Sequence, residues 1–415
     1  MRHTLDRARN AREEQQLSQS RPRLKSLSGR SPAILVFEDG SCFEGLSAGA
    51  GGSTLGEVVF NTSMSGYQEI ATDPSYRGQI VTYTMPHMGN YGVNSVDDES
   101  VEFQAAGVVV RSLARLASNH RAEQSFEEWL VAHGVVGICE VDTRELTRKL
   151  RDGGVGLGII VHDATREDAP AALKLLAAHP DYGSVDFVSE VATTRALHVS
   201  VDGDNAWEHP LRLTPLEQAM APGEGTHVVV MDFGVKFSIL RHLVARGIRV
   251  TLMPRDADLS AVEALDPDGV LWSNGPGDPD KMEPFIAQVR AISERFPTMG
   301  ICLGHQLLAK AFGGQTFKLA FGHRGPNQPV QDQRDKTVAM TSQNHGYAVR
   351  REGFPDELEV THVNLNDHTI SGFAHRTLPI HAVQYHPEAG PGPNDATSFF
   401  DRFALAIDEH YAARA

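Results

Sequence analysis

The sequence predicts an α/β protein, with an N-terminal mixed α+β domain followed by a C-terminal domain built on a central, mostly parallel sheet. In the C-terminal half, apolar runs typical of buried strands alternate with amphipathic runs typical of helices, which is the pattern of a parallel sheet covered on both faces. In the N-terminal half, short β-rich runs are broken by Gly, Pro and Asn. The 415 residues exceed one ordinary domain, so we expect more than one.

The N-terminal domain is placed at residues 32–193. It begins at Ala33–Gly45, where two β-rich runs flank an Asp-Gly pair and predict a hairpin. Ser125–Gly134 predicts a helix with a Ser N-cap and a Gly stop, and Asp142–Gly154 predicts a second helix capped by Asp142. These features favour a mixed domain over an all-helical or all-β one.

Two segments outside these domains lack the periodicity of regular structure. Residues 1–31 are rich in Arg, Gln and Ser without an apolar core, so we interpret them as a disordered tail rather than a secretory signal. Residues 194–225 gain Asp, Gly, Glu and Pro, and we interpret them as an interdomain linker. The C-terminal domain then occupies residues 226–415.

The elements of the C-terminal domain follow one another in a regular order. We expect strands at His227–Gly234, Ile248–Pro254, Asp268–Asp278 and Thr298–Cys302, and helices at Lys236–Gly247, Ser260–Asp266, Pro284–Phe296 and His305–Gly314. In such sheets the ligand site lies beyond the carboxyl ends of the strands. The loops at Ser273–Asp278 and Cys302–Gln306 both fall at that edge.

Composition excludes several classes of function. Hydrophobic residues make up 41% and charged residues 22%, an ordinary globular mixture, and the net charge of −15 argues against nucleic acid or an anionic membrane as a partner. Cys42, Cys139 and Cys302 are scattered, which fits neither a disulfide framework nor a zinc site and indicates a reducing, cytoplasmic setting. We expect no bound metal, and no apolar run approaches the roughly 18 residues of a transmembrane helix.

The stretch Gly300–Gly304, G-I-C-L-G, has the form of a nucleophile elbow with Cys302 at its centre. A nucleophile on a sharp strand-to-helix turn needs small neighbours, because the chain passes close on both sides. The helix that follows would point its N-terminus at the sulfur and favour the thiolate. A lone cysteine can also be simple packing, but the two glycines and the strand–helix context favour the nucleophile.

A thiol nucleophile needs a base, and the sequence offers several histidines. His386 and Glu388 lie where an apolar strand runs into a Pro- and Gly-rich loop, and residues i and i+2 of an extended chain face the same way. Glu388 is therefore placed to orient His386, which is the third role of a catalytic triad. His305 is expected to be structural, and His345 and His381 remain alternatives for the base.

A tetrahedral intermediate also needs oxyanion donors. The backbone N–H of Leu303 follows the nucleophile directly, and Gly275 in the S-N-G-P-G-D loop can supply a second donor. The Gly-rich run Gly153–Gly158 follows a predicted helix rather than a strand, so it lacks the context of a dinucleotide loop. The sequence contains no G-x-x-x-x-G-K-[ST] loop for ATP.

At these residues the sequence resembles known families. The stretches GICLGHQLLA, SNGPGDP, TSQNHGYAV and QYHPEAGPGP are similar to the class I, triad-type glutamine amidotransferase domain. The stretches GEVVFNTSMSGYQEIATDPSYRGQIV, PHMGNYGVN and VDTRELTRKLRDGG resemble the N-terminal domain of the small-subunit family of carbamoyl-phosphate synthases. The resemblance covers the chain from about residue 32 to the C-terminus, except for the acidic linker at residues 194–225. The tail, residues 1–31, also lies outside it.

The resemblance implies an activity and a set of residues. It implies hydrolysis of L-glutamine to glutamate and ammonia, with Cys302 as nucleophile, His386 as general base and acid, and Glu388 as its orienting partner. The implied glutamine-binding residues are Ser75, Gly275, Gly277, Leu303, Gln306, Asn344, Gly346 and Tyr347. The position of Tyr347 often carries Phe in this family, and a ring contact is expected to survive that change.

The resemblance also implies a partner. Ammonia would pass through an internal tunnel to a large subunit, where bicarbonate activated by ATP becomes carbamoyl phosphate for arginine and pyrimidine synthesis. We expect no cofactor on this chain, and ATP and Mg²⁺ on the large subunit. The alternatives are an amidotransferase that serves another synthetase, a free-standing γ-glutamyl hydrolase, and a binding module that has lost activity.

Overall fold

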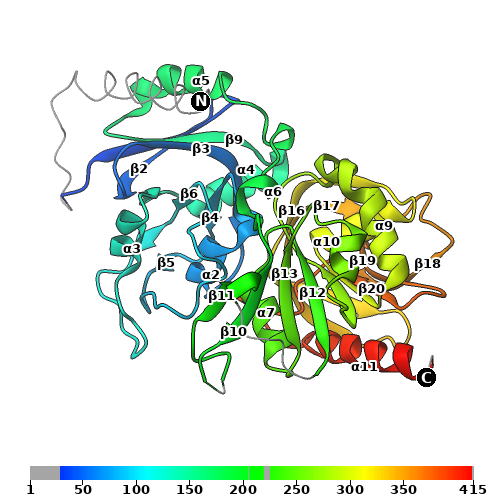
Figure 1. Ribbon diagram of the computed structural model, residues 1–415. Helices are drawn as coiled ribbons and strands as arrows, with labels where there is room; N and C mark the ends of the chain where they lie inside the picture. The colour runs from blue at the N-terminus through cyan, green and yellow to red at the C-terminus, as the bar shows by residue number, and fades with distance from the viewer. Residues whose placement is uncertain (1–28, 204, 219–224, 414–415) are drawn as a thin grey trace. The chain divides into compact units, whose positions relative to one another are not determined.

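The computed structural model describes residues 29–203, 205–218 and 225–413 (Figure 1). The predicted tail, residues 1–31, lies almost wholly outside the described residues. The chain forms two compact units. The first comprises the chain up to Met64, Gly78–Asn94 and Ala105–Tyr182, and the second comprises Ser65–Arg77, Ser95–Gln104 and everything from Gly183 onward.

The first unit is built on a closed seven-stranded barrel, drawn in blue to blue-green in Figure 1. Around the barrel the strands are, in order, β1 (Pro32–Phe37), β2 (Cys42–Gly49), β8 (Val136–Cys139), β6 (Gly107–Val109), β4 (Gln79–Tyr83), β3 (Ser53–Asn61) and β9 (Gly156–His162). β5 (His87–Met88) and β7 (Ser112–Leu113) pair separately. The predicted hairpin is confirmed, since β1 and β2 are antiparallel and Gly40 takes a φ of 83° in the turn.

Alternation along β1 explains how this barrel is packed. Leu35 lies in one apolar cluster with Ile80 and Ile138, whereas its neighbour Ile34 packs in another with helix α5 (Ala169–Ala177). α3 (Phe126–Ala132) has Ser125 as its N-cap and α4 (Thr143–Gly153) has Asp142, and both caps were predicted. Single turns of 3₁₀ helix lie at Arg166–Asp168 and Tyr182–Ser184.

The second unit contains an 11-stranded sheet, drawn in green to orange. Its strands are, in order, β11 (Leu211–Pro215), β10 (Leu197–Val201), β13 (Arg249–Pro254), β12 (His227–Asp232), β14 (Gly269–Trp272), β15 (Thr298–Ile301), β20 (Ile380–Val383), β19 (Ile370–His375), β18 (Leu358–Asn364), β16 (Thr316–Asp332) and β17 (Val338–Val349). The run from β13 to β20 is parallel, and the strands on both sides of it are antiparallel.

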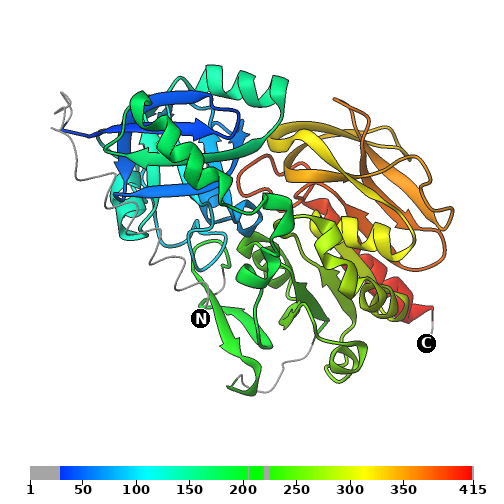
Figure 2. The ribbon, with the colours of Figure 1, turned by 90° about the horizontal axis from the view of Figure 1, so that it is seen from above.

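Helices cover both faces of this sheet (Figure 2). The helices of the second unit are α2 (Tyr67–Thr72), α6 (Val188–Val191), α7 (Phe237–Val244), α8 (Leu259–Glu263), α9 (Ile286–Arg295), α10 (Leu303–Ala311) and α11 (Ser398–Ala412), with 3₁₀ turns at Pro74–Tyr76, Leu216–Gln218 and Pro279–Phe285. Val229 of β12 packs with residues of α9 and α10, whereas Val230 packs with residues of α7 and α11. Burial on both faces is the reason why these strands read as continuous apolar runs.

The region interpreted as a linker, residues 194–225, differs from that prediction. It contains β10 and β11, which form an antiparallel hairpin that pairs with β13 at the edge of the sheet. Leu197 and Val199 are buried at every second position, and this short alternation is the local signal for the strand. The polar residues between the two strands hide that signal at the level of composition.

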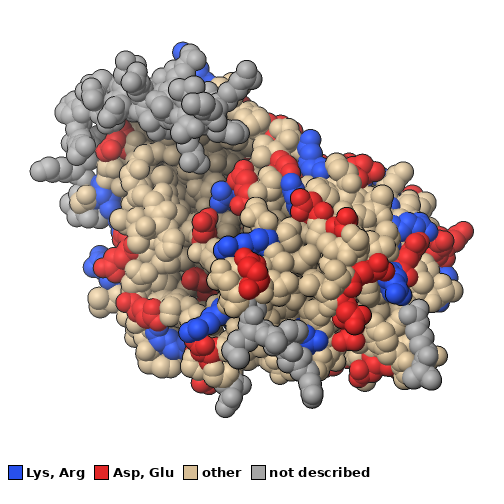
Figure 3. Space-filling model, viewed as in Figure 1, with Lys and Arg blue, Asp and Glu red and all other residues tan. Residues whose placement is uncertain are grey.

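Charged side chains of both signs are interspersed over the face drawn in Figure 3, where no continuous basic surface is seen among the described residues. This distribution agrees with the acidic net charge. None of the helices in the described part of the chain has the length and apolar character needed to cross a membrane.

Candidate active site

Cys302 lies between β15 and α10, where the buried strand turns sharply into the helix. Its backbone takes φ 53° and ψ −102°, a conformation that a non-glycine residue adopts only under strain. Cys302 is the N-cap residue of α10. The side chain is 2% exposed, and the sulfur lies 3.6 Å from the main-chain oxygen of Asn344.

The glycines on both sides of Cys302 are required by close packing. A Cβ atom on Gly304 would lie 2.1 Å from the main-chain oxygen of Trp272, and one on Gly300 would lie 2.5 Å from Leu308 Cδ1. These distances are far below van der Waals contact. The G-x-C-x-G spacing is therefore a steric requirement of this elbow.

His386 and Glu388 lie in the loop that follows β20, at the same edge of the sheet as the elbow. Glu388 Oε1 accepts a hydrogen bond from His386 Nδ1 at 2.6 Å, and both residues are 2% exposed. Because a carboxylate can only accept, Nδ1 carries a proton, and Nε2 is buried without a hydrogen-bond partner within the described part of the chain. The main-chain N–H of His386 donates to Ser342 on β17 at 2.8 Å, which fixes the loop to the sheet.

The charges of the site determine its protonation. Burial acts to lower the pKa of His386, but the charges of Glu388 and Cys302, together with the hydrogen bond to Glu388, raise it to about 10. Burial acts to raise the pKa of Glu388, but Lys236 and His386 lower it to about 2. The arrangement thus favours a charged imidazolium beside an ionised carboxylate, which is suited to proton transfer at the sulfur.

Lys236 is a member of this cluster that the sequence analysis missed. Its ammonium group is 2% exposed and donates to Glu388 Oε1 at 3.1 Å and to the main-chain oxygen of Ala389 at 2.6 Å. Burial acts to lower the pKa of Lys236, but Glu388, Glu99 and Asp73 raise it well above its ordinary value. The available signal was its position just beyond β12, at the edge of the sheet where the loops that carry Cys302 and His386 also begin.

The predicted glutamine-binding residues are partly brought together by hydrogen bonds. Ser75 Oγ accepts from Asn274 Nδ2 at 3.0 Å, and this places Ser75 next to the loop that carries Gly275. Asn344 Nδ2 donates to Asp73 Oδ2 at 2.9 Å, and the same Asp73 accepts from the Ser75 N–H at 2.8 Å. Residues far apart in sequence are thus joined within the second unit.

A second group of the predicted glutamine-binding residues lies around the start of α10. Gln306 Nε2 donates to the main-chain oxygen of Tyr347 at 2.8 Å, and a Cβ on Gly275 would meet Leu303 Cδ2 at 2.9 Å. Gly275 and Leu303, the two predicted oxyanion donors, are therefore neighbours. Gly346 precedes Tyr347 on β17, whereas Gly277 has a φ of 88° and its nearest neighbours are Phe187 and Val185.

The alternative histidines are held by other contacts. The ring of His305 is fully buried and packs against Phe373 with ring centroids 4.8 Å apart, and burial lowers its pKa to about 3. His345 lies on β17 and its Nδ1 is 2.8 Å from the main-chain oxygen of Tyr347. His381 lies in β20 itself, before the loop that carries His386.

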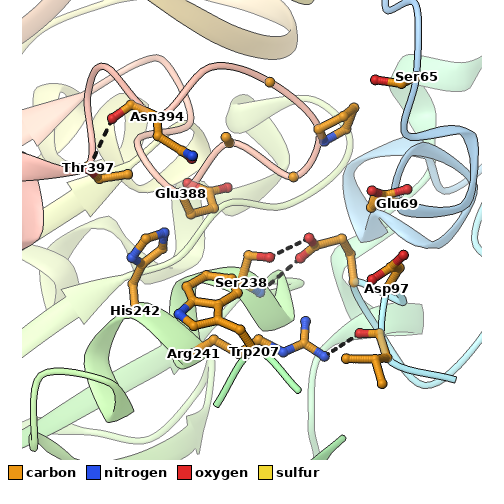
Figure 4. Close-up of a pocket in the computed structure, with 16 residues that line it drawn as sticks. Ser65, Glu69, Asp97, Trp207, Ser238, Arg241, His242, Glu388, Asn394 and Thr397 are labelled. Atoms are coloured by element: carbon orange, nitrogen blue, oxygen red, sulfur yellow. Dashed lines mark hydrogen bonds between the residues drawn. The ribbon is translucent and has the colours of Figure 1, made fainter. Parts of the chain in front are cut away.

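A cavity of about 630 Å³ lies beside the loop that follows β20 and carries His386 and Glu388 (Figure 4). One wall is the stretch Glu388–Gly392, and the opposite wall carries three acidic residues, Glu69, Asp97 and Glu99. Burial is the main cause that raises the pKa of Glu69, to about 8, and nearby Asp97 and Glu99 raise it further. Glu99 accepts hydrogen bonds from the Ser238 N–H at 2.9 Å and from its hydroxyl at 2.5 Å.

Comparison with family models agrees with the class of protein that this site defines. Residues 229–406 match the model of glutamine amidotransferase class-I, and residues 35–160 match the model of the carbamoyl-phosphate synthase small chain, CPSase domain. The C-terminal domain is therefore a class I glutamine amidotransferase domain. The first match covers the elbow, the His386 loop and Lys236.

Individual relatives identify the family. Proteins named carbamoyl phosphate synthase small chain are 48% identical over 380 residues in Rhodopirellula baltica, 47% over 383 residues in Parasynechococcus marenigrum and 46% over 376 residues in Akkermansia muciniphila. The alignments cover 91%, 91% and 90% of this chain and 96%, 96% and 97% of those proteins. The chain belongs to the carbamoyl phosphate synthase small chain family.

The elbow geometry predicts that Gly304→Ala is strongly destabilising. The new methyl group would collide with the backbone of Trp272, which cannot move without disturbing β14, so we expect a loss of about 2–3 kcal/mol in the free energy of unfolding. Urea denaturation measures this. Gly153→Ala is the control, because a Cβ there meets nothing within 4 Å. Equal stabilities of the two variants would contradict the packing argument.

The raised pKa of Glu69 predicts that the free energy of unfolding depends on pH. Between its ordinary pKa of 4.5 and the folded value of about 8, the folded chain holds a proton that the unfolded chain has released, so this group makes stability fall as the pH rises. Glu69→Gln should remove this contribution and stabilise the protein more at pH 8 than at pH 5, as measured by the urea midpoint.

Glu102→Gln is the control for this measurement, since Glu102 is an exposed carboxylate in the same unit. A gain for Glu69→Gln that is equal at both pH values would show that Glu69 ionises as it does in the unfolded chain.

Proposed function

We propose that this chain is the glutaminase subunit of a carbamoyl-phosphate synthase and that Cys302, His386 and Glu388 are its catalytic triad. The observation that carries the proposal is the meeting of two independent elements at one sheet edge. One is a cysteine in a strained strand-to-helix turn, and the other is a buried His386–Glu388 pair with a 2.6 Å hydrogen bond. Each alone has a structural explanation, but together they form a nucleophile with an oriented base.

The triad residues act in the order that acyl transfer requires. The thiolate of Cys302 attacks the carbon of the glutamine side-chain amide and forms a tetrahedral intermediate. His386 then donates its proton to the amide nitrogen, the C–N bond breaks, and ammonia leaves behind a glutamyl thioester. A water molecule that gives its proton to His386 attacks the thioester, and glutamate leaves as the thiolate is restored.

The oxyanion of these intermediates is placed near two backbone donors. The N–H of Leu303 opens α10, whose positive dipole end also faces this point, and Gly275 packs beside Leu303. One such donor contributes roughly 3 kcal/mol of transition-state stabilisation. The close approach at Gly275, where a Cβ would lie 2.1 Å from the Phe233 oxygen, explains why this donor must be a glycine.

Glutamine binding is assigned to the residues around the elbow. Ser75, Asn344 and Tyr347 present polar groups and a ring, and Gln306, Leu303 and the glycines 275, 277 and 346 leave room for the substrate's backbone and side chain. Because Cys302 is 2% exposed, glutamine can reach the sulfur only when side chains around it move apart. Binding and local opening are therefore coupled.

The ammonia is proposed to be used by a second chain. Ammonia in water at neutral pH is mostly ammonium, which is not nucleophilic, so a water-poor passage to a large synthetase subunit would preserve its reactivity. There it would react with bicarbonate activated by ATP and Mg²⁺, giving carbamoyl phosphate for arginine and pyrimidine synthesis. The scattered cysteines fit a cytoplasmic enzyme. The match of residues 35–160 disfavours a free-standing hydrolase, which would not need this domain.

Cys302→Ser should abolish carbamoyl phosphate synthesis from glutamine but not synthesis from ammonium. With the large subunit present, we expect glutamine-dependent carbamoyl phosphate synthesis to fall by at least about a thousandfold, because the nucleophile is lost, while synthesis from added ammonium persists. Measurement of carbamoyl phosphate from each source tests this. Loss of both activities would indicate that Cys302 is structural.

Glu388→Gln should reduce both activity and stability, because it leaves the ammonium of Lys236 buried beside a neutral amide. Breaking such a buried pair costs about 3–5 kcal/mol. We expect the double variant with Lys236→Met to recover much of the unfolding free energy but not the rate of glutamine hydrolysis. Recovery of the rate as well would remove Glu388 from the triad.

A further inference from the structure

Asn274 is a fully buried asparagine to which the proposed reaction assigns no role. It lies in the loop after β14, directly before Gly275, and its side chain is 0% exposed. Burying an amide costs free energy unless its polar atoms are hydrogen-bonded. Both ends of this amide are used, since Oδ1 accepts from the Lys236 main-chain N–H at 3.1 Å and Nδ2 donates to Ser75 Oγ at 3.0 Å.

The bond to Lys236 determines which end of the Asn274 amide faces Ser75. A main-chain N–H can only donate, so the atom that meets it must be the amide oxygen, and the NH₂ group is the end beside Ser75. The backbone is fixed as well, because the Ser273 hydroxyl donates to the Asn274 main-chain oxygen at 2.8 Å and accepts from the Phe233 N–H at 2.9 Å. Asn274 therefore presents a donor to Ser75 in a single orientation.

This contact determines what the Ser75 hydroxyl can offer to a ligand. A hydroxyl has one hydrogen to donate, and when an N–H points at its oxygen, that hydrogen must point elsewhere. Within the described ranges of the chain, Asn274 is the one side chain to which the Ser75 hydroxyl is hydrogen-bonded. The hydroxyl hydrogen is thus left for a ligand, and Ser75 can act as a donor at this site.

Short contacts connect Ser75 with the nucleophile. Asp73 accepts from the Ser75 N–H at 2.8 Å through Oδ1 and from Asn344 Nδ2 at 2.9 Å through Oδ2. The main-chain oxygen of Asn344 lies 3.6 Å from the sulfur of Cys302. A substrate that reaches the sulfur therefore lies close to residues that hold Ser75 in place.

We propose that Asn274 is a positioning residue for glutamine binding, which makes the Ser75 hydroxyl a hydrogen-bond donor to the α-carboxylate of the substrate. This role rests on the proposed function of the site. Glutamine carries acceptor oxygens on its side-chain amide and on its α-carboxylate, and the amide oxygen is already assigned to the N–H groups of Leu303 and Gly275. The carboxylate is the acceptor that remains, and a charged acceptor strengthens such a bond.

The test begins with Asn274→Asp in the complex with the large subunit. The substitution keeps the side-chain shape and the oxygen that accepts from Lys236, but an ionised carboxylate cannot donate, so the Ser75 hydroxyl should turn its hydrogen toward it. At about pH 8 we expect KM for glutamine to rise at least about tenfold, with kcat within about threefold. Toward about pH 6 the KM relative to wild type should fall, because a protonated carboxyl group donates as the amide did.

A second substrate provides a measurement that packing alone would not change. L-Glutaminamide carries a neutral carboxamide in place of the α-carboxylate. In Asn274→Asp the Ser75 oxygen should present lone pairs rather than a hydrogen to the ligand, which suits the N–H of a carboxamide and not a carboxylate. We expect the ratio of kcat/KM for glutamine to kcat/KM for glutaminamide to fall at least about tenfold relative to wild type.

Three further variants complete the design. Asn274→Ala has no donor at any pH, so its KM for glutamine should be raised at pH 6 and pH 8 alike. In a Ser75→Ala background the same substitution should raise KM by less than about twofold, because the hydroxyl through which Asn274 acts is gone. Asn366→Asp makes the matched change at an exposed asparagine of the same unit and should leave KM within about twofold.

The outcomes are distinguishable. An unchanged KM in both Asn274→Asp and Asn274→Ala would overturn the positioning role, as would an Asn274→Ala effect that persists in full without the Ser75 hydroxyl. Equal losses of kcat/KM for glutamine and glutaminamide would show that Asn274 serves packing alone. Absence of glutamine hydrolysis by the wild-type complex would overturn the proposed function itself.

Discussion

The hydrogen-bonded charges of Lys236, Glu388 and His386 are the interaction on which the rest of this site depends. None of the three side chains is more than 2% exposed, so each charge is stable only because the next one compensates it. Glu388 Oε1 accepts a hydrogen bond from each of its neighbours, at 3.1 Å from Lys236 Nζ and at 2.6 Å from His386 Nδ1. A single displaced member would leave an unpaired charge in the interior, and the arrangement is therefore held in one geometry.

The fold supplies the rigid frame for this arrangement. The parallel strands β12, β15 and β20 end at one edge of the sheet, and Lys236, Cys302 and His386 follow them by a few residues. Each strand is buried on both faces, so its end cannot shift without disturbing a packed layer. The strained turn at Cys302 is maintained by that packing.

The features that the sequence predicted well are local ones. The elbow glycines, the His386–Glu388 spacing and the strand–helix alternation each occupy a few consecutive residues, and their physical meaning can be read from neighbours alone. Lys236 was missed because its partner Glu388 is 152 residues away, and a single lysine after a strand has no distinguishing pattern. Glu99 was missed for the same reason, since its bonds to Ser238 span 139 residues.

The fold, too, could be predicted from local sequence patterns only in part. The composition of residues 194–225 hid two short strands, and the closure of the first unit's strands into a barrel depends on pairings such as β1 with β9 that no local pattern specifies. Ser65–Arg77 and Ser95–Gln104 lie within the predicted N-terminal domain by sequence but belong to the second unit by contact. Through these segments Ser75 contacts Asn274 and Glu99 contacts Ser238, which sequence order alone does not reveal.

Covalent labelling tests the central claim most directly. The intact protein would be treated with a glutamine analogue that carries a chloroketone in place of the amide, and the adduct located among Cys42, Cys139 and Cys302 by peptide mass spectrometry. The account predicts one adduct, on Cys302, whose formation is slowed by glutamine. An adduct confined to the partly exposed Cys42, or labelling of Cys302 that glutamine does not slow, would contradict it.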